Sequence, residues 1–115
     1  MRIVVMNSHE HDVNACYISH LPHLISFSLA NTVMSHQNPK EIIALAAGGF
    51  KDMSRIAKSS PRMWGDIFKQ NRQNMLESIK SFEDQMNEAK KMIEDERYEE
   101  LEDWMKKANS LHEIL

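Results

Sequence analysis

Cysteine, glycine, proline and aromatic residues are all scarce in this sequence of 115 residues. It has one cysteine, three glycines and three prolines, and aromatic side chains make up 7% of it. The single Cys16 cannot form a disulfide within the chain, so nothing points to an oxidising compartment, and we expect a cytoplasmic protein. The shortage of turn residues disfavours a β-sheet domain of this length. We therefore expect an all-α fold.

The sequence also lacks a long apolar run and an excess of positive charge. Residues 13–39 carry no charged side chain, but polar residues such as Ser19, His20 and His23 interrupt them, so we expect no membrane span. The formal net charge of -3 does not favour nucleic acid as a partner. Gly48-Gly49 lacks the third glycine of a dinucleotide-binding fingerprint, so no cofactor site is expected within these residues.

The first third of the chain contains a β-like segment and then an apolar helix. Residues Met1–Met6 are typical of a strand, but they have no second strand to pair with. Asn7 and Glu10 have the spacing of a capping box. From Val13 to Met34 apolar residues fall on nearly every helical face, which predicts a helix that a partner chain must cover. Pro22 predicts a kink or break near Ile18–Ser19.

The rest of the chain predicts three further helices. Asn38-Pro39 is a helix start, and we expect a short helix over Glu41–Ala47 that Gly48-Gly49 ends. Ser60-Pro61 opens a long amphipathic helix that reaches Ile93, in whose apolar stripe only Asn71 is polar. A last stripe from Tyr98 to Leu111 predicts a helix that folds back on the long one as an antiparallel pair.

Ser19-His20-Leu21-Pro22-His23 is the densest polar cluster in the uncharged half. On a helix, His20 and His23 lie one turn apart on one face. Buried histidines that are satisfied within the core and histidines that bind a ligand are both compatible with this pattern. A metal site is the weakest alternative, because no third ligand with zinc-like spacing is present, and we expect no metal.

A second cluster, Gly48-Gly-Phe-Lys-Asp-Met-Ser-Arg-Ile-Ala57, combines paired glycines with an arginine. Glycines allow another backbone or a ligand to approach closely. Arg55 offers a planar fork that can hold a carboxylate through two parallel hydrogen bonds. The simpler interpretation is a helix end followed by an exposed arginine.

Taken together, the two clusters and Ser60-Pro-Arg-Met-Trp64 resemble the C-terminal half of prephenate dehydrogenases, and His11-Asp12 fits the same region. The resemblance implies that Arg55 binds a substrate carboxylate, that His23 contacts the substrate, and that Trp64 lines the pocket. His20 would support them. Gly49 would lie in the segment that a neighbouring subunit brings to the active site, so the expected partner is a second copy.

The resemblance also implies the reaction. Members of the family oxidise and decarboxylate prephenate to 4-hydroxyphenylpyruvate with NAD or NADP in tyrosine biosynthesis, and arogenate is the alternative substrate. Their nucleotide-binding domain, with the catalytic histidine, has no counterpart in these residues. We therefore expect residues 1–8 to be the remnant of that domain, residues 9–115 to be the helical dimerisation and substrate-binding domain, and the chain alone to be inactive. The alternative is a non-catalytic helical interaction module.

Overall fold

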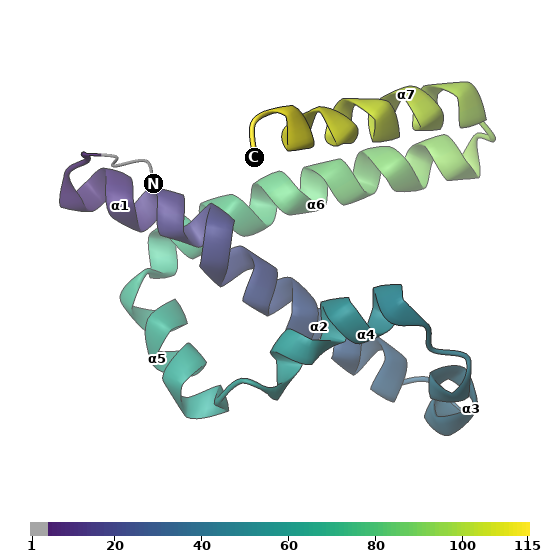
Figure 1. Cartoon of the computed structure of the whole chain (residues 1–115), viewed down its shortest axis with the longest axis horizontal. Coiled ribbons are helices and arrows are strands. Elements are labelled where there is room, and N and C mark those ends of the chain that lie inside the picture. The colour runs from purple at the N-terminus through teal and green to yellow at the C-terminus, as the bar shows by residue number, and fades with distance from the viewer. Residues whose placement is uncertain (1–4) are drawn as a thin grey trace. The chain divides into compact units, whose positions relative to one another are not determined.

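A computed structural model of the chain describes residues 5–115, which form helices joined by short turns (Figure 1). The predicted all-α fold is confirmed. Most of the predicted strand, residues 1–4, lies outside the described residues, and Val5 and Met6 are not in a strand. The chain divides into two compact units, one ending at Ser78 and the other spanning Ile79–Leu115. No helix within residues 5–115 is long and apolar enough to cross a membrane.

The first unit begins with α1 (Ser8–Ala15), whose start follows the predicted capping box. The backbone N–H of Glu10 donates to Asn7 Oδ1 at 2.8 Å, and the N–H of Asn7 donates to Glu10 Oε2 at 3.3 Å. These two bonds satisfy backbone donors that the first turn of a helix leaves without partners.

A π-helix, η1 (Cys16–His20), interrupts the α-helical repeat before α2 (Leu21–Met34). The N–H of Leu21 donates to the carbonyl of Cys16, five residues back. Pro22 has no N–H, and its ring would clash with the carbonyl of Ile18 in a regular α-helix. The wider turn removes this conflict. The predicted interruption near Ile18–Ser19 is therefore confirmed.

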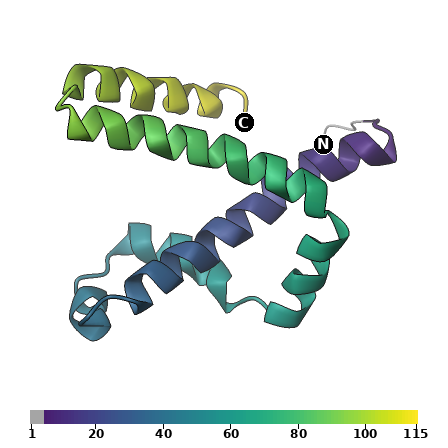
Figure 2. The ribbon, with the colours of Figure 1, turned by 180° about the vertical axis from the view of Figure 1, so that it is seen from behind.

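The segment after α2 differs from the prediction. Helix α3 (Pro39–Ala44) starts at the expected proline but ends before the glycines. Gly48 and Gly49 form the first turn of another helix, α4 (Gly48–Arg55), which continues into a short 3-10 helix, η2 (Ile56–Lys58). Neither glycine has a positive φ angle, so neither provides the left-handed C-cap that the sequence suggested. In both ribbon views α4 lies beside α2 (Figures 1 and 2).

The predicted single long helix is also wrong, because it consists of two helices that meet at Asn71. Helix α5 (Pro61–Gln70) starts at Ser60, whose hydroxyl accepts a hydrogen bond from the N–H of Met63 at 3.3 Å. Asn71 has φ -117° and ψ 34°, outside the helical range, and α6 (Arg72–Glu94) follows it. The stripe of apolar residues continues across the break, which is why periodicity alone does not detect it.

The second unit is the helix pair that the sequence predicts. Helix α7 (Tyr98–Asn109) runs back along α6, and the indole N–H of Trp104 donates to Gln85 Oε1 at 2.8 Å. A final 3-10 helix, η3 (Ser110–Glu113), follows. Between the two helices Glu96 has φ 55°, and the N–H of Arg97 bonds the carbonyl of Met92 at 2.8 Å. This arrangement is a Schellman cap with a glutamate where glycine is usual.

Few apolar side chains are fully enclosed among the described residues. The buried ones are Cys16, Leu21, Trp64, Met75 and Met92. By contrast, Ile18 is 82% exposed and Leu45 is 86% exposed. The helix that the sequence predicted to be covered by a partner chain therefore leaves part of its apolar surface, including Ile18, exposed within residues 5–115.

Candidate functional site

Two histidines at the junction of η1 and α2 contact a tryptophan from α5. Trp64 is 7% exposed. The ring of His23 stacks on its indole, with centroids 3.6 Å apart and an angle of 19° between the planes. His20 approaches the same indole edge-on, at 5.9 Å and 77°. Contacts of both kinds favour a defined ring orientation. The structure thus brings together three of the five predicted site residues.

A hydrogen bond to the backbone determines which ring nitrogen of a neutral His23 carries the hydrogen. Its Nδ1 lies 2.8 Å from the carbonyl oxygen of Ser19. A carbonyl oxygen can only accept, so Nδ1 carries the proton. In the neutral ring Nε2 is then an acceptor, and in the protonated ring it is a donor. His23 can therefore offer its second nitrogen to a ligand in either role.

His20 is held in a less polar environment. Burial lowers the pKa of His20 below its ordinary value, and the nearby His23 lowers it further. Asp12 acts in the opposite direction, with a smaller effect. The lowered pKa favours a neutral His20 ring near pH 7.

Asn71, which the sequence analysis noted only as a polar interruption, connects α5 and α6 to the π-helix. Its Nδ2 donates to the backbone carbonyl of Asp12 and to the sulfur of Cys16, both at 2.9 Å. His20 Nδ1 is farther away, at 3.5 Å. Because an amide nitrogen has two hydrogens, the two nearer acceptors take them. Oδ1 in turn accepts a bond from Asn74 at 2.8 Å.

A small pocket of about 170 Å³ opens beside this asparagine. It is lined by Asp12, His20, Ile67, Gln70 and Asn71. One predicted site residue, His20, therefore separates two environments, because its ring contacts Trp64 and it also lines this pocket. The one signal in the sequence for this arrangement was an asparagine in an otherwise apolar stripe.

Arg55 lies at the end of α4, on the surface. It lines a shallow pocket of about 430 Å³ together with Lys51, Asp52, Ser54 and Lys58. No carboxylate within residues 5–115 lies at ion-pair distance from its guanidinium. No hydrogen bond or ring contact joins it to the histidines or to Trp64 in this part of the chain. Its charge is therefore available to an anion.

Gly49 is exposed in the first turn of α4. A Cβ atom placed on it would meet no heavy atom within 4 Å among the described residues, and its φ angle is not positive. Neither the backbone nor the packing described here requires glycine at this position. Its predicted contact with a neighbouring subunit remains a prediction.

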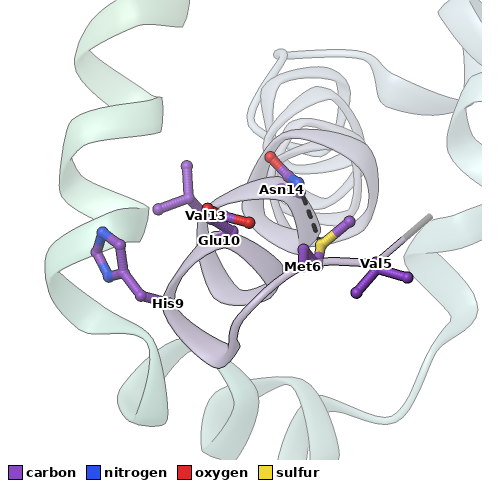
Figure 3. A pocket seen from close by; sticks show the side chains of 6 residues that line it. All are labelled: Val5, Met6, His9, Glu10, Val13 and Asn14. Carbon is purple, nitrogen blue, oxygen red and sulfur yellow. Dashed lines mark hydrogen bonds between the residues drawn. The ribbon is translucent and has the colours of Figure 1, made fainter.

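The other polar clusters of the first unit have weaker features. Burial raises the pKa of the Cys16 thiol, and Asp12 adds to the effect, so the thiol stays protonated. A further pocket of about 380 Å³ lies between Val5, Met6 and α1, where Asn14 Nδ2 donates to the sulfur of Met6 at 3.4 Å (Figure 3). None of the predicted site residues lines it. Within residues 5–115 no group of three or more potential ligands could hold a metal ion.

Comparisons with known proteins agree with this arrangement of motifs. Residues 7–107 match the family described as prephenate dehydrogenase, dimerization domain. The chain is 34% identical to a prephenate dehydrogenase of Bacillus subtilis over 97% of its length, and 35% identical to a cyclohexadienyl dehydrogenase of Zymomonas mobilis over 70%. It covers 30% of the first relative and 28% of the second.

A solved structure resembles the fold closely. It is the prephenate dehydrogenase from A. aeolicus in complex with hydroxyphenyl propionate and NAD+, which is 37% identical and superimposes with a TM-score of 0.88. The match covers 99% of this chain and 41% of that one. The chain thus spans less than half the length of each of these relatives. Since the family match extends over most of the sequence, the chain belongs to the prephenate dehydrogenase dimerization-domain family.

Proposed function

We propose that this chain is the dimerisation and substrate-binding domain of an NAD(P)-dependent prephenate dehydrogenase. The observation that carries the proposal is the pair of histidines against buried Trp64, in a chain that belongs to this family. The reaction removes a hydride from the hydroxyl-bearing ring carbon of prephenate and releases the ring carboxylate as carbon dioxide, giving 4-hydroxyphenylpyruvate. Arogenate is the alternative substrate.

Each proposed contact follows from the chemistry of a side chain. A substrate with two carboxylates needs a cation, and the Arg55 guanidinium has no carboxylate partner within residues 5–115. His23 presents Nε2 to a substrate oxygen, because its Nδ1 is bound to Ser19. Trp64 provides an aromatic wall, and His20 supports it from the edge.

The residues described here do not form a binding site for NAD or NADP. A dinucleotide site needs a strand followed by a glycine-rich turn, and residues 5–115 contain no strand. We therefore assign no cofactor contact and no part of hydride transfer to this chain. We expect no NAD-dependent turnover of prephenate by the chain alone.

The active form is proposed to be a homodimer in which Gly49 of one copy approaches the site of the other. Exposed apolar side chains support this proposal, because Ile18, Met34 and Leu45 are each more than half exposed. Burying these side chains against a second copy would remove apolar surface from water, which favours association. Light scattering of the chain at micromolar concentration is expected to give the mass of a dimer, and a monomer at that concentration would contradict the proposal.

The substrate-binding role is tested with hydroxyphenyl propionate, which carries one phenol and one carboxylate. We expect it to shift the NMR signals of His23 and Trp64 when it is titrated into the chain. Arg55→Ala removes a charge-assisted hydrogen bond and is expected to weaken binding about ten- to a hundredfold. Arg62→Ala, on the exposed first turn of α5, is the matched control. Unchanged affinity in Arg55→Ala would overturn the role of this residue.

A further inference from the structure

Ser26 is a buried hydroxyl in the middle of the apolar helix α2. Its side chain is 2% exposed, and its Oγ donates to the backbone carbonyl of Met53 at 2.6 Å. The two residues are 27 positions apart in the sequence, so this bond joins α2 to α4. A buried polar group in apolar surroundings is unfavourable unless it is bonded, and this bond satisfies it.

The other hydroxyl groups of α2 behave differently. Ser28 donates to the carbonyl of Leu24, and Thr32 donates to the carbonyl of Ser28, both at 2.8 Å within the same helix. Such local bonds to a preceding turn are common for serine and threonine in helices. Ser26 instead bonds to another helix, which makes it a connection between elements.

The acceptor lies where α4 needs a partner from outside. Met53 is in the last turn of α4, which ends at Arg55 and narrows into the 3-10 helix η2. The last four carbonyls of an α-helix have no partner within the helix. The Ser26 hydroxyl therefore caps the end of α4 from a neighbouring helix.

This cap lies two residues before Arg55. The guanidinium has no carboxylate partner within residues 5–115, so ion pairing does not hold the side chain in place. Its position depends on the backbone at the end of α4. Apolar contacts between α2 and α4 favour burial but are not directional, whereas a hydrogen bond of 2.6 Å fixes how one helix sits along the other.

We propose that Ser26 is a positioning residue for Arg55, acting through the Met53 carbonyl. The inference rests on the proposed role of Arg55 in binding a substrate carboxylate. Removal of the hydroxyl leaves the carbonyl without its partner and allows the end of α4 to shift or fray. The Arg55 side chain is then less well oriented toward the substrate carboxylate, although neither its charge nor its exposure has changed.

The test compares four forms of the chain, which are the wild type, Ser26→Ala, Arg55→Ala and the double variant. The affinity for hydroxyphenyl propionate is measured by NMR titration, and amide hydrogen exchange reports the opening of α4. We expect Ser26→Ala to raise exchange in α4 about tenfold and to weaken binding about three- to tenfold. Ser28→Ala, which removes an exposed hydroxyl from the same helix, should leave both measurements unchanged.

The double variant separates positioning from a general loss of stability. If Ser26 acts through Arg55, adding Ser26→Ala to Arg55→Ala will not weaken binding further. If Ser26→Ala weakens binding equally in the wild type and in Arg55→Ala, the inference is overturned. If Arg55→Ala weakens binding but Ser26→Ala changes neither the affinity nor the hydrogen exchange of α4, or only one of the two, the inference is also overturned. If Arg55→Ala itself has no effect, the proposed function of Arg55 fails, and the inference fails with it.

Discussion

Replacing Asn71 with alanine removes three hydrogen bonds that tie the junction of α5 and α6 to its surroundings. The amide donates to the Asp12 carbonyl and the Cys16 sulfur at 2.9 Å, and it accepts a bond from Asn74 at 2.8 Å. The bond to Asp12 is exposed, so water can replace it at little cost. The other two are partly buried, and each contributes about 0.5–1.5 kcal/mol. We expect Asn71→Ala to lower the free energy of unfolding by about 1–3 kcal/mol.

Urea unfolding followed by far-UV circular dichroism at pH 7 measures this change. Asn71→Asp is the stricter test, because it keeps the acceptor for Asn74 but replaces the donor with a carboxylate facing two acceptors. It should be less stable than Asn71→Ala. Asn87→Ala, at an exposed position of α6, should change stability by less than about 0.5 kcal/mol. An aspartate variant as stable as the wild type would refute the reasoning that the amide acts as a donor.

Two further predictions concern the turn of the second unit and the half-buried His20. Glu96 has φ 55°, which is unfavourable for any residue with a Cβ, so Glu96→Gly should raise the free energy of unfolding by about 0.5–1 kcal/mol. The control Glu99→Gly, within α7, should lower the free energy of unfolding. A Glu96→Gly variant that is less stable than the wild type would contradict this reasoning. Because burial lowers the pKa of His20, the unfolded chain binds its proton more readily, and stability should decline as the pH falls below about 6.5, the ordinary value. Urea titrations at several pH values measure this decline, and His20→Gln should make it shallower. The control His112→Gln, at an exposed position, should leave the decline unchanged. If His20→Gln and the wild type lose stability equally as the pH falls, His20 is not the cause.

Signals that lie close together in the sequence predicted the helices well. The Asn7 capping box, the Ser60 cap and the interruption before Pro22 all depend on residues within one or two turns, and all are found in the structure. Helical periodicity likewise predicted the pairing of α6 and α7. In each case the physical cause is local, so the sequence pattern contains most of the information.

Features that depend on distant residues were missed. The long stripe hid the break at Asn71, because the stabilising acceptors, Asp12 and Cys16, lie more than fifty residues earlier. Gly48-Gly49 were interpreted as a helix end, although they start α4. The motifs did identify His20, His23 and Trp64, which lie together, but no spacing rule could reveal that Ser26 caps the helix of Arg55.

The π-helix sets the rotation of α1, which precedes it. An α-helix advances about 100° per residue, so one residue deleted between Cys16 and His20 would restore a regular repeat and turn α1 by roughly that angle. The Asp12 carbonyl would then face away from Asn71. Helix α1 has no buried residue of its own to resist such a turn. The direction in which α1 faces thus depends on the wider turn that accommodates Pro22, a residue that lies beyond it.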